Sequence, residues 1–195
     1  MAIPSPVPHD WGIAPCLDLI NSRWRDHLGS GRVYDRLPNP VFRRALLERW
    51  HYDVEDPDDA GAQARLGSMR TLLRGLLEQY LSGRRLGRSM QRKLELEINR
   101  AEMAFRLSTE SGGYALSIQR SGAGWDLVTS DIAMSAARLI ADGALVKQCA
   151  NPSCTWMFVD ETRSGTRRWC NVSICGSLIN VRRHRAQRLP GGLSR

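Results

Sequence analysis

Four of the five cysteines in this chain lie close together near its C-terminal end, in two pairs. Cys149 and Cys154 form the first Cys-x4-Cys pair, Cys170 and Cys175 form the second, and 15 residues separate them. Two turns that each present two thiolates are typical of a single tetrahedral metal ion. The spacing therefore predicts a Zn²⁺ site. Because four thiolates leave no open coordination position, we expect the zinc to be structural rather than catalytic.

Other states of these cysteines are two disulfides, an iron–sulfur cluster or four buried free thiols. The N-terminal residues show no basic segment followed by an apolar run. A cytoplasmic location is therefore expected, and disulfides are disfavoured there. Four thiols so close in sequence are too many for chance packing. An iron–sulfur cluster stays open, because four cysteines also suit a cluster, although tighter spacings would be expected for it.

The formal net charge of +8 is concentrated at the same end of the chain. Residues 162–195 contain eight Arg and no Lys, Asp or Glu, which leaves 20 basic residues (28 minus 8) against 20 acidic residues in positions 1–161. A basic end on a neutral body predicts a polyanionic partner, with DNA first. The alternative is a solvated face, or a face paired with acidic residues of the body. The arginines expected to contact DNA are Arg167, Arg168, Arg182, Arg183, Arg185 and Arg188.

The remaining polar residues do not suggest catalysis. The four His (9, 27, 51 and 184) are scattered, and no nucleophile and base share a catalytic spacing, so we expect no enzyme activity. Cys16 stands in an apolar context typical of inert packing. Asp18 and Asn21 interrupt the apolar segment CLDLIN and are candidate groups for a small-molecule effector. The alternative for both is helix capping or buried hydrogen bonding.

Apolar spacing predicts helices over roughly 15–26, 40–50, 60–80 and 90–105. YALSIQ and WDLVT flank the turn RSGAG, which predicts a β-hairpin near 114–129, and Ser130 is expected to cap a further helix. No apolar run is long enough to span a membrane. The predicted fold is mainly α with a small β-hairpin, comprising a helical N-terminal domain at 1–145 and a small treble-clef-like zinc module at 146–190.

The C-terminal segment CANPSCTWMFVDETRSGTRRWCNVSICGSLINVRRHRAQR resembles the CGNR zinc-finger family. The shared features are both cysteine pairs, a hairpin with Phe158 and Asp160, the run from Arg168 to Cys170, and the basic helix that starts at Val181. The upstream CLDLIN and WDLVTSDIA segments and the helical body resemble the ABATE domain that accompanies this finger.

The resemblance implies a bacterial, stress-related transcription regulator that binds DNA through its zinc module. Its N-terminal domain would sense an effector or form a homodimer. The second hypothesis is a small-molecule-binding or interaction protein whose zinc module is only structural. Where the family has Cys-Gly-Asn-Arg, this chain has Ser177 and Leu178 after the glycine, and Asn180 replaces a usual Lys. Metal ligation is unaffected, but two helix cations are missing, so weaker DNA binding is expected.

Overall fold

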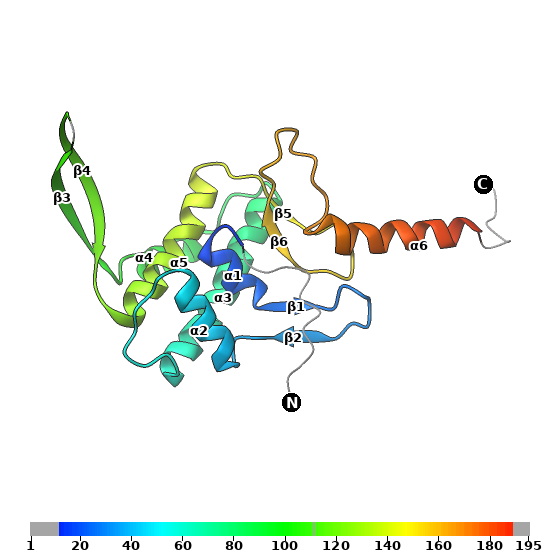
Figure 1. Cartoon of the computed structure of the whole chain (residues 1–195), viewed down its shortest axis with the longest axis horizontal. Helices are drawn as coiled ribbons and strands as arrows, with labels where there is room; N and C mark the ends of the chain where they lie inside the picture. The colour runs from blue at the N-terminus through cyan, green and yellow to red at the C-terminus, as the bar shows by residue number, and fades with distance from the viewer. Residues whose placement is uncertain (1–11, 111, 189–195) are drawn as a thin grey trace.

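A computed structural model describes residues 12–110 and 112–188 (Figure 1). It has six α-helices among these residues, together with three antiparallel two-stranded sheets. The prediction of a mainly α fold with a C-terminal cysteine module is confirmed. The helices are α1 (Pro15–Asn21), α2 (Pro40–Arg49), α3 (Ala60–Leu81), α4 (Arg88–Ile98), α5 (Gly124–Ala141) and α6 (Ser177–Arg188), the last preceded by a π-helical turn η1 (Val172–Gly176). The strand pairs are β1 (Arg23–Arg25) with β2 (Val33–Asp35), β3 (Glu102–Glu110) with β4 (Gly113–Ser121), and β5 (Val146–Gln148) with β6 (Met157–Val159).

Helices α1, α3 and α5 form the centre of the main core, and α4 packs along α3 and α5. On α3, Leu66, Leu73 and Leu77 recur at helical spacing and are fully buried. They face a matching stripe on α5 that includes Val128 and Ile132. Every residue of α1 is buried, so this short helix is enclosed by the rest of the domain.

The first helix is shorter than predicted. It ends at Asn21 rather than near residue 26, and β1 follows directly. Along β1 the exposure alternates, with Trp24 buried between exposed Arg23 and Arg25, which is the period of a strand. Trp24 therefore packs in the cluster around the cysteines and not in the core of the helices.

The hairpin predicted near 114–129 is misplaced in part. β4 begins as expected, but its partner is β3, whose first residues were predicted as the end of the helix at 90–105, and WDLVT lies in α5. Val128 and Ile132 lie four residues apart on the buried side of α5, so the helical period is satisfied there. Ser130, predicted as a cap, is inside α5, where its hydroxyl donates to the carbonyl of Ile98.

The C-terminal segment packs directly on the helices. Val146 of β5 and Met157 of β6 belong to the main core. The Arg74 guanidinium, from α3, donates to the carbonyls of Thr155 (3.2 Å) and Ile20 (3.3 Å), and so joins three segments. Packing is continuous across the position near 145 at which the sequence predicts a domain boundary. None of the helices in the described residues has the length and apolarity needed to cross a membrane.

Candidate metal centre and nucleic-acid interface

The four predicted ligand cysteines converge on one point. Their Sγ atoms all lie within 4.8 Å of one another, and all four residues are buried. Cys170 and Cys175 are 3.6 Å apart, and Cys154 and Cys170 are 3.8 Å apart. A tetrahedral zinc ion with Zn–S bonds of about 2.3 Å places its sulfurs about 3.8 Å apart. The separations are too long for a disulfide, and they suit one ion better than a cluster that spreads its thiolates over several irons.

Cys149 and Cys154 are presented by the turn between β5 and β6, and Asn151 builds that turn. Its carbonyl accepts from the Cys154 amide (2.8 Å) and its Oδ1 accepts from the Ser153 amide (3.1 Å). The Asn151 Nδ2 donates to the carbonyl of His27 (3.0 Å) and lies 3.6 Å from the Cys175 Sγ. This buried side chain therefore links the first cysteine pair to the second pair and to the β1–β2 loop.

Cys170 and Cys175 are presented by the start of the helical segment that becomes α6. Asn171 begins this segment, since its Oδ1 accepts from the amides of Ser173 (2.9 Å) and Ile174 (3.2 Å). A Cβ atom on Gly176 would lie 3.0 Å from the Trp169 Cδ1, so the Trp169 ring occupies the space a side chain would need. The glycine of the Cys-Gly motif is thus explained by packing.

The crowding of four thiols has an electrostatic consequence. Hydrogen bonds from Cys154, Cys170 and Cys175 lower the pKa of the Cys149 thiol. The hydrogen bond with Cys149 raises the pKa of Cys154 and of Cys170. A divalent cation among the sulfurs would offset their mutual repulsion and favour the thiolate form of all four. The donor set therefore fits Zn²⁺ in chemistry as well as in spacing.

Aromatic side chains replace a conventional core around the cysteines. Trp24, Trp156 and Phe158 are buried against them. The Trp24 and Trp156 rings meet edge to face with centroids 6.3 Å apart, and Tyr34 stacks on Trp24 at 5.2 Å. Trp24 and Tyr34 come from the N-terminal part of the chain, so two distant segments together build this cluster.

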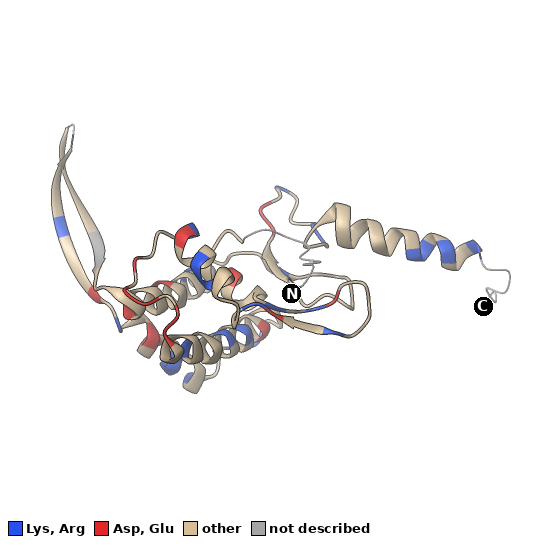
Figure 2. Ribbon diagram, turned by 60° about the horizontal axis from the view of Figure 1, so that its bottom comes forward, with Lys and Arg blue, Asp and Glu red and all other residues tan. Residues whose placement is uncertain are grey.

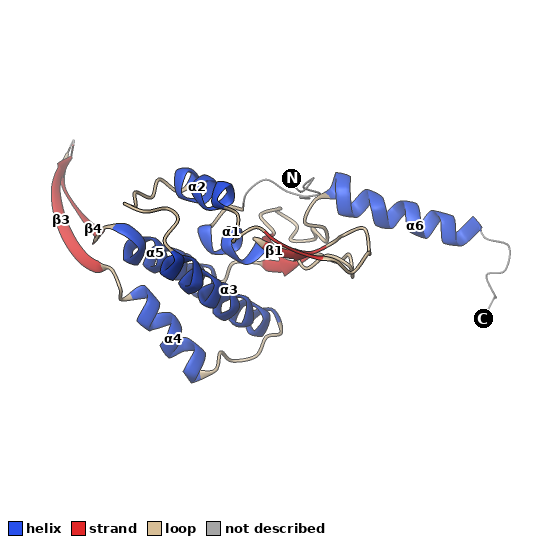
Figure 3. Cartoon of the chain, turned by 90° about the horizontal axis from the view of Figure 1, so that it is seen from below, coloured by secondary structure: helices blue, strands red, loops and turns tan. Residues whose placement is uncertain are grey.

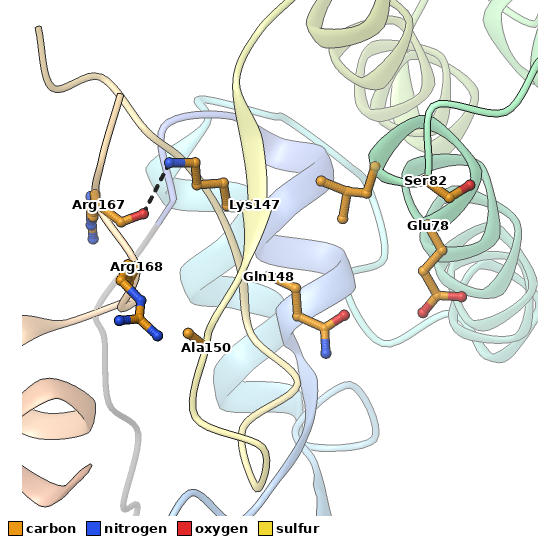
Figure 4. A pocket seen from close by; sticks show the side chains of 8 residues that line it. Glu78, Ser82, Lys147, Gln148, Ala150, Arg167 and Arg168 are labelled. Atoms are coloured by element: carbon orange, nitrogen blue, oxygen red, sulfur yellow. Dashed lines mark hydrogen bonds between the residues drawn. The ribbon is translucent and has the colours of Figure 1, made fainter. Parts of the chain in front are cut away.

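Asp160 organises the loop between β6 and Cys170. Its buried carboxylate accepts from the Lys147 Nζ (2.6 Å), the Thr162 hydroxyl (2.6 Å) and the Arg167 amide (2.8 Å). Burial alone would raise the pKa of Asp160, but these donors hold it well below its usual range. The Lys147 Nζ also donates to the Arg167 carbonyl at 3.1 Å (Figure 4). The Lys147 ammonium group therefore forms its hydrogen bonds inside the protein.

The six predicted DNA-contacting arginines fall into two groups. The Arg167 guanidinium donates to the carbonyls of Trp169 (2.9 Å) and Cys170 and lies 4.5 Å above the Phe158 ring. Arg182 donates to the carbonyl of Leu28 in the β1–β2 loop. These hydrogen bonds hold both side chains against neighbouring backbone, and the phosphate contacts predicted for them stay a prediction.

The other four predicted arginines are exposed: Arg168, Arg183, Arg185 and Arg188. Arg168 lies 5.3 Å over the Trp169 ring. Within residues 12–110 and 112–188, none of the four forms an ion pair with a carboxylate, which argues against pairing with the body. Helix α6 buries no residue and projects from the module, and Figure 2 shows its outer half rich in basic residues and free of acidic ones.

The β1–β2 hairpin, whose loop accepts the hydrogen bond from Arg182, also carries exposed basic residues. Arg25 and Arg32 are exposed on the β1–β2 hairpin. The Arg25 amide donates to the Thr155 hydroxyl (3.0 Å), and the loop that follows holds the carbonyl bonded by Arg182. Neither residue stands out in the sequence, because the segment that contains them belongs to the neutral part of the chain.

The predicted ligand-binding pair is engaged inside the protein. Asp18 accepts from the Trp50 Nε1 (2.8 Å) and the Gly12 amide, and Arg49 lies 3.7 Å away. Burial raises the pKa of Asp18 to about 6, although these neighbours lower it in part. Asn21 forms two hydrogen bonds with the Met157 backbone. Both side chains therefore form buried hydrogen bonds, which is the alternative to effector binding given for them in the sequence.

An open cavity of about 540 Å³ lies between the end of α3 and the cysteine module (Figure 4). Lys147 and Arg167 in its wall already form hydrogen bonds within the protein. Glu78 lies 3.9 Å from the Arg74 guanidinium, and Arg168 brings the opposite charge. The cavity therefore indicates no particular class of ligand. Its lining residues are Glu78, Leu81, Ser82, Lys147, Gln148, Ala150, Arg167 and Arg168.

The fold and the cysteine cluster together define a class of protein: a helical domain that carries a zinc-finger-type module. The family model ABATE, described as "putative stress-induced transcription regulator", matches residues 14–143. The model CGNR zinc finger matches residues 146–188. The chain belongs to the ABATE family and carries a CGNR zinc finger after that domain, which confirms the resemblance seen in the sequence. Among curated proteins, none matches the chain.

Proposed function

We propose that this protein is a DNA-binding transcription regulator without enzymatic activity, acting in the reducing cytoplasm. One Zn²⁺ held by Cys149, Cys154, Cys170 and Cys175 shapes the C-terminal end, and the basic surface around α6 contacts duplex DNA. The observation that carries the proposal is α6 itself: a projecting helix with no buried residue, whose exposed arginines have no acidic partner in the described residues.

The metal would be held by the two turns described above. When bound, it supplies the positive charge that the thiolates require, and it joins the β5–β6 turn to the segment that starts α6. The chain's own contribution is the orientation of α6. Arg182 fixes its first turns against Leu28, and the Trp169 ring packs on Gly176 just before the helix begins.

The dimensions of α6 suit a DNA groove. Its 12 residues span about 18 Å at 1.5 Å per residue, and the major groove of B-DNA, about 12 Å wide, admits one α-helix. Arg183, Arg185 and Arg188 would contact DNA from the helix, while Arg25 and Arg32 would reach phosphates beside it. Leu178 and Asn180 bring no charge, so we expect the phosphate backbone to dominate affinity.

A salt titration of binding to labelled random duplex DNA tests this function. If about four to six phosphates are neutralised, log K falls against log salt with a slope of roughly −4 to −5, from about −0.9 per contact. The double variant Arg183→Ala with Arg185→Ala should make the slope shallower by about two units. The matched control is Arg92→Ala with Lys93→Ala, which removes two exposed charges from α4.

The control should bind as the unmodified chain does. Equal weakening by both double variants would mean that net charge alone drives binding, without a defined surface. Failure to bind any duplex at low salt would contradict the proposal and favour the interaction-protein hypothesis.

A further inference from the structure

The β3–β4 hairpin stands away from the rest of the molecule (Figures 1 and 3). Its nine residue pairs run without a bulge from Glu102 opposite Ser121 to Glu110 opposite Gly113. Neither strand packs broadly against any other element of the described chain. An isolated two-stranded hairpin is at best marginally stable in water, because only one strand pair supports it.

One face of this hairpin is apolar. Met103, Phe105 and Leu107 alternate along β3, and Leu116 lies opposite Leu107, while Tyr114 lies opposite Thr109, so all five share one side. Their exposed fractions are 54%, 65%, 68%, 68% and 76% in that order. The other side carries small or polar residues: Ala104, Arg106, Ser108, Ala115 and Ser117.

The exposed apolar area is large for a surface left in water. Five large side chains at these exposures present on the order of 600 Å². A patch of that size on a projecting arm marks an interaction surface, since soluble proteins rarely expose more. The area per copy approaches the roughly 800 Å² that each partner contributes to a standard interface.

We propose that the apolar face of β3–β4 is the contact between two copies of this chain, stacked face to face about a two-fold axis. Two such faces bury about 1,200 Å² of apolar surface together, and their polar rims bring the total into the range of stable interfaces. In a two-fold contact the same patch meets itself, so a uniform apolar surface suffices. The register pairs Arg120 with Met103 at the end of the hairpin nearest the helical body, so the uncharged part of this face runs from Phe105 outward to Tyr114.

The position of the arm is compatible with the proposed function and does not depend on it. The hairpin lies at one end of the long axis and α6 projects at the other (Figure 1). Pairing through the hairpin therefore leaves both copies of α6 free.

Sedimentation equilibrium of the full zinc-loaded chain tests the proposal. The unmodified protein should have a mass of twice 21.9 kDa. Leu107→Glu places a carboxylate on the apolar face and should weaken self-association by at least about a hundredfold, because burial of unpaired carboxylates is costly. Ser108→Glu is the matched control: it adds the same charge one residue further on, on the opposite face, and should leave the dimer intact.

Circular dichroism and zinc content establish that each variant is folded, and Phe105→Glu with Leu116→Glu provides a second test should Leu107→Glu misfold. A monomeric unmodified chain would overturn the proposal. A monomer that binds phosphatidylcholine vesicles through this hairpin would also overturn it, because the apolar face would then contact lipid. A dimer that persists in both apolar-face variants would also overturn it, since the contact would then lie elsewhere.

Discussion

Asn21 and Met157 are joined by two hydrogen bonds although 136 positions separate them in the sequence. The Asn21 Nδ2 donates to the Met157 carbonyl (2.8 Å), and the Met157 amide donates to the Asn21 Oδ1 (2.9 Å). Both residues are buried, so the side-chain amide of α1 satisfies both backbone groups of a β6 residue. This pair attaches the cysteine module to the helical body.

Asn21→Ala should lower the free energy of unfolding by about 2–4 kcal/mol, because it leaves the buried amide and carbonyl of Met157 without partners. Asn21→Asp keeps the acceptor but removes the donor, and should also destabilise the fold. Urea denaturation measures both effects. Asn180→Ala, on the exposed α6, is the control and should change stability by less than about 0.5 kcal/mol. An Asn21→Ala protein as stable as this control would mean that the pair contributes nothing.

Metal removal should loosen more than the C-terminal segment. Trp24 and Tyr34 pack in the cysteine cluster, and the His27 carbonyl is bonded by Asn151 of the first cysteine turn. After chelation, hydrogen exchange should therefore speed up in residues 22–36 as well as in 146–188, whereas the α4–α5 pair keeps its protection. A loss confined to 146–188 would show that the module folds independently of the β1–β2 hairpin.

Gly176→Ala should destabilise the module by about 1–3 kcal/mol, since the added methyl group would press on the Trp169 ring at 3.0 Å. The expected signs are altered tryptophan fluorescence and faster loss of zinc to a chelator. Gly67→Ala on α3 is the matched control. Its Cβ would have only Leu37 near it, at 4.0 Å, so the change should be neutral or stabilising by up to about 1 kcal/mol. Equal zinc retention in both variants would rule out a steric role for Gly176.

The cysteine site could be predicted because its ligands come in pairs that are local in sequence. A turn around Asn151 and a helix start after Asn171 each place two thiolates, so spacing alone carries the signal. The support from Trp24 and the β1–β2 arginines could not be predicted in the same way. It depends on contacts between residues 21–32 and 151–182, which no local pattern records.

The misplaced hairpin has a different cause, which is competition between two periods. Ile98, Ala101 and Phe105 suit a helical spacing, yet Met103, Phe105 and Leu107 also alternate, and the structure follows the alternation. Because the hairpin packs on no core, the burial of apolar side chains does not decide between a helical and a strand pattern in this segment. Phe105 was therefore predicted at the end of a helix, whereas it is exposed on a projecting arm.

Asp18 gives the fold a pH dependence of opposite sign to that of a salt-bridged carboxylate. Burial raises its pKa in the folded protein to about 6 from 3.8, so the folded state binds this proton more tightly than the unfolded state. The contribution of Asp18 to the free energy of unfolding is most favourable below pH 3.8 and is lost as pH rises towards about 6. The total loss is about 3 kcal/mol.

Asp18→Asn removes this titration. The stability of the unmodified chain minus that of Asp18→Asn should therefore fall between about pH 4 and pH 6 in urea denaturation. Taking the difference cancels the protonation of the cysteines, which is common to both proteins. A difference that stays constant over this range would mean that Asp18 has an ordinary pKa.

The metal content of the purified chain tests the central claim most directly. Native mass spectrometry of protein prepared without added metal should show one zinc per chain, and Cys→Ser changes at positions 149, 154, 170 and 175 should each abolish stable zinc binding. Cys16→Ala is the control, since Cys16 is buried in the helical core and burial raises the pKa of its thiol to about 12. It should retain one zinc. An iron chromophore, no metal in the unmodified chain, or full zinc in the four cluster variants would contradict the account.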